Sequence, residues 1–266
     1  MTELVNRLIL NRVQPKLDKH LEDNQNGFRP SRSTNSHILA LRRIIEEVKR
    51  RNLEAVILFV DFSKAFDSVH RGKMMKILRA YGIPEQIVKT ISKFYIDTKA
   101  RVHSPDGETE FFEILAGVLQ GDTLAPYLFV IVIDYIMRMT IEDKATEIGF
   151  TLYPRRSSRV QAINVTDLCF ADDIALLTNQ LKQAKDLLQK LESEAMKVGL
   201  HVNTKKTELM AFNQAVVTTE VTSVNGNAIK QVENFKYLGG WLESSEHDVK
   251  IRIALAWSVC HRLLKI

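Results

Sequence analysis

Two short stretches of this sequence place carboxylates directly beside apolar runs. Leu168–Leu177 (LCFADDIALL) carries Asp172 and Asp173 in its middle, and the run Ala55–Val60 leads straight into Asp61. A lone carboxylate is costly to bury unless it is paired or bound to a metal ion. Two strand-like stretches that each bring carboxylates to one end therefore predict a shared cation site.

The predicted site suits phosphoryl-transfer chemistry. A divalent cation such as Mg²⁺ is usually held by one or two carboxylates together with waters and substrate phosphates. Asp61 and Asp172 can supply the carboxylates, and the backbone carbonyl of Phe62 is a further oxygen ligand. Two metal ions roughly 3.5–4 Å apart would stabilise both the attacking and the leaving oxygen of an in-line displacement. The alternative is an ordinary hairpin turn at Asp172 and a strand-end cap at Asp61, and the apolar flanks on both stretches favour the metal site.

The elements that must position these residues alternate irregularly between helices and hairpins. Val160–Phe170 and Ile174–Thr178 predict a hairpin with Ala171–Asp172–Asp173 at its tip, and Ala55–Phe62 predicts a buried strand. Amphipathic or apolar helices are predicted at the ranges 38–48, 124–141, 183–198 and 249–264. This order favours an α+β fold with an antiparallel sheet and two helices packed on one face.

The composition is that of an ordinary globular protein. The 266 residues are 45% hydrophobic and 26% charged, and the net charge of +5 permits a polyanionic partner without demonstrating one. The longest apolar run, Leu124–Ile133, contains Pro126 and is too short to cross a bilayer. Two cysteines provide no disulfide framework. We therefore expect an intracellular protein, cytoplasmic and/or nuclear, with no membrane partner.

Six stretches together resemble a known family. Asp61–Asp67 (DFSKAFD) and Phe170–Asp173 (FADD) resemble motifs A and C of reverse transcriptases, in the form found in non-LTR (LINE-type) retrotransposons. Four more stretches, in the family's order, resemble the fingers motif and motifs B, D and E: Asn26–Thr34, Gly117–Pro126, Gly199–Met210 and Phe235–Leu242. Six ordered motifs spread over nearly the whole chain make the resemblance specific.

The resemblance implies a fold and an activity. The fold is a polymerase palm-type antiparallel sheet with helices on one face, plus partial fingers and the start of a thumb. Residues 1–53 would be partial fingers and the entry to the palm, 54–242 the palm, and 243–266 the beginning of a thumb helix. The activity is RNA-directed DNA synthesis, in which dNTPs are added to a primer 3′-OH on an RNA template. The implied cofactors are two Mg²⁺ ions, with Mn²⁺ as a possible substitute, and the implied partners are the RNA template, the DNA primer and dNTPs.

Residue by residue, the resemblance implies a catalytic set. Asp61 and Asp172 correspond to the aspartates that hold the metal ions, with Asp173 in a lesser, partly structural role and Phe62 as the carbonyl ligand. Lys206 corresponds to the motif D lysine, a candidate proton donor to the leaving pyrophosphate or a stabiliser of its charge.

It also implies a nucleotide site and a primer grip. The nucleotide-binding residues would be Arg29, Arg32, Phe62, Phe66, Gln120 and Gly121. Arg29 would contact nucleotide phosphate, and Phe66 would reject a 2′-OH by steric clash. A core role for Phe66 and a solvated loop role for Arg32 remain open. The primer grip would comprise Tyr237, Leu238, Gly239 and Gly240.

Two features leave an alternative open. Motif B has Leu119 and Asp122 where many reverse transcriptases carry Pro and Ser. Only the range 249–266 is left to supply a thumb, which normally clamps the duplex through phosphate contacts. The alternative function is a truncated or domesticated, catalytically inactive palm that acts as an RNA-binding or protein-interaction domain.

Overall fold

The computed structural model describes residues 2–105, 107–141, 148–154, 157, 162–214, 220–242 and 244–263. The helices are α1 (Thr2–Leu17), α2 (Thr34–Arg51), α3 (Ala65–Ser68), α4 (Arg71–Ala80), α5 (Glu85–Phe94), α6 (Ala125–Ile141), α7 (Leu181–Lys197) and α8 (Ser245–Leu263). The strands are β1 (Ala55–Val60), β2 (Lys99–Ala100), β3 (His103–Ser104), β4 (Gly107–Glu108), β5 (Phe112–Glu113), β6 (Phe150–Tyr153), β7 (Ile163–Val165), β8 (Asp167–Phe170), β9 (Asp173–Thr178), β10 (Glu208–Phe212), β11 (Lys230–Gln231), β12 (Lys236–Tyr237) and β13 (Gly240–Trp241).

A central five-stranded sheet organises the molecule, with the strand order β11-β10-β1-β9-β8. Every pairing is antiparallel except that of β10 with β11. In the pairing of β1 with β9, Val60 lies opposite Ile174. The C-terminal end of β1 and the N-terminal end of β9 therefore lie at the same end of the sheet, which brings Asp61 close to Asp173.

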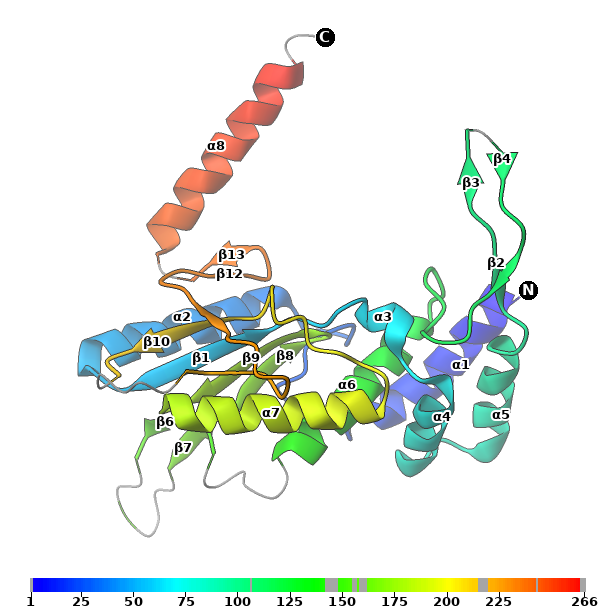
Figure 1. The fold of residues 1–266 in the computed structure, drawn as a ribbon, viewed down its shortest axis with the longest axis horizontal. Helices are drawn as coiled ribbons and strands as arrows, with labels where there is room; N and C mark the ends of the chain where they lie inside the picture. The colour runs from blue at the N-terminus through cyan, green and yellow to red at the C-terminus, as the bar shows by residue number, and fades with distance from the viewer. Residues whose placement is uncertain are drawn as a thin grey trace.

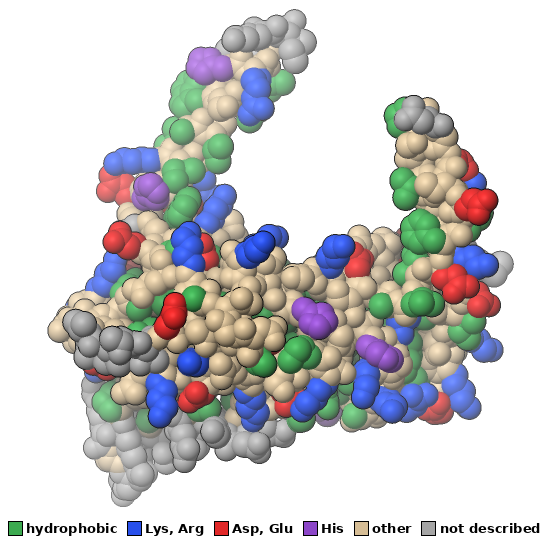
Figure 2. Space-filling view, viewed as in Figure 1, with side chains coloured by type: hydrophobic (Ala, Val, Ile, Leu, Met, Phe, Trp, Pro, Cys, Tyr) green, Lys and Arg blue, Asp and Glu red, His purple; other side chains and the backbone are tan. Residues whose placement is uncertain are grey.

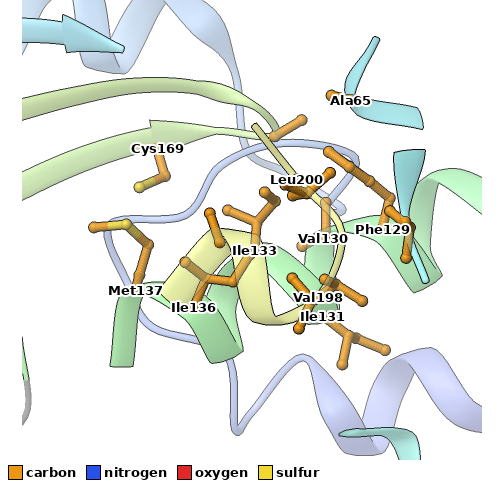
Figure 3. Packing of buried hydrophobic residues seen from close by; sticks show 14 of the residues in the cluster. Ala65, Phe129, Val130, Ile131, Ile133, Ile136, Met137, Cys169, Val198 and Leu200 are labelled. Atoms are coloured by element: carbon orange, nitrogen blue, oxygen red, sulfur yellow. The ribbon is translucent and has the colours of Figure 1, made fainter. Parts of the chain in front are cut away.

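The strand β1 is buried along its whole length because both faces of the sheet are covered. Val56, Leu58 and Val60 belong to a core shared with α6 and α7. Figure 3 shows part of this core, where side chains of α6 lie beneath Cys169 of β8. An unbroken apolar run is typical of a strand with two covered faces.

The second face of the sheet carries its own core. Ala55, Ile57 and Phe59 pack there with Leu41 and other residues of α2. Figure 1 shows α2 on one side of the sheet and α6 and α7 on the other. The predicted pair of helices on one face is confirmed, and α2 is an additional layer that the prediction did not include.

Two projections leave this body (Figure 1). One is the long hairpin formed by the β2–β5 and β3–β4 pairs, and the other is α8, which rises from the small β12–β13 hairpin. The side chains of α8 are mostly exposed, and its large exposed apolar residues are Val249, Ile253, Leu255, Trp257, Val259 and Leu263.

Element boundaries differ from the predictions at a few places. The final helix begins at Ser245, four residues before the predicted start at 249. Residues 158–161, which include the start of the predicted strand from Val160, lie outside the described residues. In the part of the chain that the structure describes, no helix is long and apolar enough to cross a membrane.

Candidate active site

Three carboxylates gather at the edge of the sheet where β1 ends and β9 begins. Phe170 pairs with Asp173 across the β8–β9 hairpin, so Ala171 and Asp172 alone form the turn. The sequence predicted that Asp173 is part of the hairpin tip, but the structure shows it as the first residue of β9. Asp61 directly follows β1, the neighbouring strand.

The carboxylates repel one another in the absence of a cation. Removal from water, followed by the charges of Asp172 and Asp61, raises the pKa of Asp173 to about 6. The pKa of Asp172 is also raised, first by burial and then by Asp61. One carboxylate oxygen of Asp61, Oδ2, is buried and accepts no hydrogen bond. These are the properties of oxygen donors whose charge a bound cation would neutralise.

A lysine side chain, that of Lys206, approaches this cluster. Its Nζ lies 4.0 Å from Oδ2 of Asp61. The loop that carries it is fixed to β1, because Asn203 N–H donates to the Asp61 carbonyl at 2.8 Å and Asp61 N–H donates to the Thr207 hydroxyl at 3.3 Å. Backbone contacts on both sides of Lys206 therefore set its place beside Asp61.

The donor set fits an open divalent-cation site. Within the described residues no group of three or more His, Cys, Asp or Glu side chains is arranged to hold a metal ion. Mg²⁺ does not require one, since it commonly uses one or two protein carboxylates and completes its shell with water and phosphate oxygens. Asp61 and Asp172 are carboxylates of the kind that such a site uses. The backbone at Phe62 is fixed by its neighbour, because Ser63 N–H donates to the His201 carbonyl and Phe62 forms a bridge with Val202. The Ser63 bond does not use the carbonyl of Phe62.

Phe66 forms one wall of a pocket between α3 and the start of α6. Its ring stacks on Phe129 of α6, with the centroids 4.3 Å apart, and meets the edge of the exposed Phe28 at 6.3 Å. The pocket has a volume of about 340 Å³, and its other lining residues are Leu119, Gln120, Gly121, Ala125 and Pro126. The two interpretations of Phe66 are thus compatible, because one face of the ring packs on the core while the side chain lines the pocket.

The motif B loop is held close to the segment that bears Phe66. A Cβ on Gly117 would lie 2.6 Å from Cα of Asp67, so only glycine permits this approach. Gln120 Nε2 donates to Asp67 Oδ1 at 2.7 Å, and Gly121 adopts φ +85° at the surface. Gln120 and Gly121 therefore lie next to Phe66 and line the same pocket.

Arg71 is a positioning residue that the sequence did not reveal. Its Nε donates to the Gly117 carbonyl at 3.0 Å, while NH1 donates to the Ile114 carbonyl and the Thr98 hydroxyl, both at 2.7 Å. A single arginine in the first turn of a helix has no distinctive pattern, so no local signal could have identified it.

Asp122, which stands where motif B of many reverse transcriptases has Ser, has a structural role. Asp122 Oδ1 accepts a hydrogen bond from Leu124 N–H at the start of α6, and Oδ2 accepts one from Asn6 Nδ2 at 2.7 Å. The residue thus joins α1 to the beginning of the helix that supports Phe66.

The two arginines of the fingers motif differ in their surroundings. The side chain of Arg29 is 2% exposed, and it donates to Asp18 Oδ1 at 2.7 Å and to the carbonyls of Asp18, Glu22 and Gln25. All three nitrogens of its guanidinium group are engaged, so a phosphate contact would require these bonds to open. Arg32 is paired with the exposed Asp23 at 2.8 Å and stays near the surface.

The predicted primer-grip residues form the β12–β13 hairpin. Leu238 and Gly239 make its two-residue turn with φ +48° and +82°, which is the backbone of a type I′ hairpin. Gly240 packs against Ile38 of α2, and a Cβ on it would lie 3.2 Å from that side chain. Tyr237 is buried and points its hydroxyl at the β8–β9 hairpin, within 3.1 Å of the Asp173 carbonyl.

The base of α8 is tied to the same hairpin. Asp248 Oδ2 pairs with Arg42 of α2 at 3.2 Å and with Arg252 at 3.1 Å, while Arg252 also donates to the Gly239 carbonyl. Trp241 donates its N–H to Asp248 Oδ1 and offers its carbonyl to Arg42, so its backbone holds the junction.

An antiparallel sheet with helices behind it and carboxylates at the shared end of two central strands defines a polymerase palm. Comparison with known proteins agrees with this class. Residues 2–242 match the family "Reverse transcriptase (RNA-dependent DNA polymerase)", and the chain belongs to that family.

The similar proteins are non-LTR retrotransposon polyproteins. The type-2 retrotransposable element R2DM polyprotein of Drosophila melanogaster is 26% identical over 229 residues, which cover 81% of this chain and 20% of the polyprotein. The RNA-directed DNA polymerase from mobile element jockey of the same species is 26% identical over 270 aligned positions, covering 97% of this chain and 28% of its own length. The predicted non-LTR resemblance is thus confirmed, and the chain spans only a minor part of these relatives.

Solved structures show the same fold. Apo telomerase from Candida tropicalis, truncated from its C-terminal domain, superposes with a TM-score of 0.58 over 90% of this chain and 43% of that one. The sequence identity is 15%, so this likeness concerns the fold alone.

Proposed function

We propose that this chain is the catalytic core of an RNA-directed DNA polymerase that adds dNTPs to a primer 3′-OH on an RNA template. The observation that carries the proposal is the convergence of Asp61, Asp172 and Asp173 at one edge of the palm sheet, with Lys206 4.0 Å from Asp61. Family membership gives the reaction class, and the name of the jockey relative specifies RNA-directed DNA synthesis for that protein.

The roles of the residues follow from their positions. Asp61 and Asp172, with the Phe62 carbonyl, would hold two Mg²⁺ ions, for which Mn²⁺ is a substitute; such ions stabilise the attacking and leaving oxygens of phosphoryl transfer. Lys206, exposed and beside Asp61, can reach a phosphate bound there and neutralise or protonate the leaving pyrophosphate.

The Phe66 pocket would receive the sugar of the incoming nucleotide. Phe66 is held on two sides by aromatic rings, so it resists displacement by a 2′-OH. Gln120 and Gly121 supply the far side of this pocket. Arg32, which keeps solvent access, is the better placed of the two fingers arginines to contact phosphate from this loop.

The architecture supports a matching division of the chain. Residues 54–242 would form the palm, 1–53 a partial fingers region and 243–266 the beginning of a thumb helix. The described strands all lie between residues 55 and 241, and α8 follows them. Figure 2 shows α8 and the β2–β5 arm standing on either side of an open hollow. A template–primer duplex held there would meet the β12–β13 hairpin at the base of α8.

The test is primer extension on poly(rA)/oligo(dT) with Mg²⁺. The wild-type chain should extend the primer, and Asp172→Asn should abolish synthesis because a ligand is lost while the fold is kept. Asp186→Asn, an exposed aspartate on α7, is the matched control and should retain activity. A folded wild-type chain that binds RNA but never extends a primer would instead support an inactive RNA-binding palm.

A further inference from the structure

The turn that carries Asp172 is braced from outside its own hairpin. Ala171, the residue before Asp172, adopts φ +54°, a left-handed conformation that residues other than Gly, Asn and Asp seldom take. Ala171 is 3% exposed although it lies in a two-residue turn. A strained, buried turn needs neighbours that hold it in place.

The brace is the side-chain amide of Gln25. Its Oε1 accepts hydrogen bonds from Ala171 N–H at 2.9 Å and from Gly27 N–H at 2.7 Å. Its Nε2 lies 3.4 Å from the Ala171 carbonyl oxygen. The amide therefore engages both backbone polar groups of the residue that precedes Asp172, and Gln25 itself is 2% exposed.

The backbone around Gln25 fixes this amide in register with the hairpin. Cys169 N–H donates to the Asn24 carbonyl at 2.9 Å, and Asn26 N–H donates to the Cys169 carbonyl at 2.8 Å. Asn24 Nδ2 also donates to the buried Asp167 Oδ2 at 2.6 Å. The segment 24–27 thus runs along β8 as a short parallel extension of the sheet.

Gly27 closes the contact. A Cβ at this position would lie 2.2 Å from the Ala171 nitrogen, so no side chain can enter between the segment and the turn. Together, Gln25 and Gly27 leave Ala171 no room to shift without breaking several hydrogen bonds.

We propose that Gln25 is a positioning residue for catalysis, which holds the Ala171–Asp172 turn so that the Asp172 carboxylate faces Asp61. Gln25 does not touch the reacting atoms and acts through the turn. This inference rests on the proposed polymerase function. A displacement of about 1 Å in a catalytic group can cost roughly 100-fold in rate. Because Gln25 sets the position of Asp172 and does not contact the substrate, its loss should change the rate more than the affinity for the nucleotide.

The kinetic test uses Gln25→Met, which keeps the length of the side chain and removes its hydrogen bonds. Single-nucleotide incorporation should show kcat reduced roughly 10- to 100-fold, with KM for the dNTP changed less than about threefold. Gln189→Met is the matched control, because that amide also donates to backbone carbonyls, of Thr222 and Ser223, away from the carboxylates. A folded Gln25→Met protein with the wild-type kcat would overturn the proposal, as would an equal loss in Gln189→Met.

Hydrogen exchange of the substrate-free protein tests the brace without activity. In the wild-type chain the Ala171 amide should be protected, and Gln25→Met should lose this protection while amides of β1 keep theirs. An unprotected Ala171 amide in the wild type would overturn the proposal even if the variant failed to fold. If the wild type is folded but extends no primer, the proposed function fails, and the exchange result alone then decides whether Gln25 holds the turn.

Discussion

The hydroxyl of Tyr237 lies 3.1 Å from the Asp173 carbonyl and 3.3 Å from the Leu168 carbonyl. It has one proton to donate, so the two carbonyls share it. The ring is buried beside Phe59, with the centroids 5.7 Å apart. The β12–β13 hairpin is therefore attached to the strands that bear the carboxylates, and a primer end held by that hairpin would have a fixed distance to Asp173.

Tyr237→Phe should weaken this attachment. The loss of one buried hydrogen bond is expected to lower stability by about 1 kcal/mol. Primer extension should slow several-fold, with the dNTP KM little changed, because the primer end and the carboxylates would no longer move together. Thermal melts and single-turnover incorporation measure both effects. Tyr153→Phe, at a more exposed tyrosine, is the control, and equal behaviour of the two variants would contradict the prediction.

Lys206→Met should reduce the rate of the chemical step by about 100-fold or more, since about 100-fold is the low end of the usual contribution of a general acid. The Nζ of Lys206 lies 4.0 Å from Oδ2 of Asp61, and the pyrophosphate would develop negative charge near this position as it leaves. Lys205→Met removes the neighbouring charge but keeps the contact of Lys206 with Asp61, so the rate of the chemical step should change little. Pre-steady-state incorporation distinguishes them, and a Lys205 variant as slow as the Lys206 variant would refute a specific role.

Phe66→Val should increase incorporation of rNTPs relative to dNTPs, by roughly tenfold or more, because a smaller side chain leaves space for the 2′-OH. The stack on Phe129 will also be lost, and an aromatic pair of this kind is worth about 0.5–1.5 kcal/mol beyond its buried area. Phe129→Leu is the control, since it disturbs the same stack from the core side. Competition assays with both nucleotide types measure the ratio. Unchanged sugar selectivity in Phe66→Val would leave Phe66 with a packing role alone.

Much of the sheet and its carboxylate edge could be predicted because the signals are local. The unbroken apolar run of β1 and the Asp-bearing β8–β9 hairpin are both visible in the sequence, and their antiparallel pairing then brings Asp61 to Asp173. The additional layer formed by α2 was not predicted, since an amphipathic pattern shows that a helix has a buried face but not which face of the sheet it covers.

The contacts that hold the site could not be predicted. Gln25 reaches Ala171 across 146 positions of chain, and Arg71 reaches the Gly117 carbonyl across 46. Such bonds depend on tertiary placement, which single-residue types do not encode. Arg29 shows the same limit: its motif suggested a phosphate contact, whereas its guanidinium lies buried among carbonyls and Asp18.

The burial of Arg29 leads to a prediction about stability. Arg29→Met would leave Asp18 and several carbonyls without their donor, and breaking such a buried network typically costs about 3–5 kcal/mol. Arg32→Met removes a surface pair and should change stability by less than about 1 kcal/mol. Urea unfolding of both variants measures the difference. Equal, small effects would mean that the Arg29 network contributes little, and its motif-based role at the nucleotide would regain support.

The carboxylate cluster predicts a pH-dependent response to metal. The pKa of Asp173 is raised to about 6, so the folded state favours its protonated form. The stability that this proton contributes is fully present below the unfolded pKa, near 3.9, and is lost as pH rises through about 6. Metal-free Asp173→Asn should therefore match the wild type at pH 4 and exceed it at pH 8. The excess should be of the order of 1 kcal/mol, or about 2–4 °C in Tm, after allowance for solvent screening at this surface position.

Added Mg²⁺ should act on the same charge. At pH 8 it should raise the Tm of the wild type more than that of Asp173→Asn, because the cation neutralises a carboxylate that the variant lacks. Since the ion binds the ionised form, the Mg²⁺ concentration for half-maximal primer extension should rise roughly fourfold from pH 7.5 to 5.5. Melts and activity titrations at the two pH values measure these shifts. A wild-type Tm that does not respond to Mg²⁺ at pH 8, or a half-maximal concentration independent of pH, would contradict a cation site at Asp61 and Asp172 that the charge of Asp173 influences.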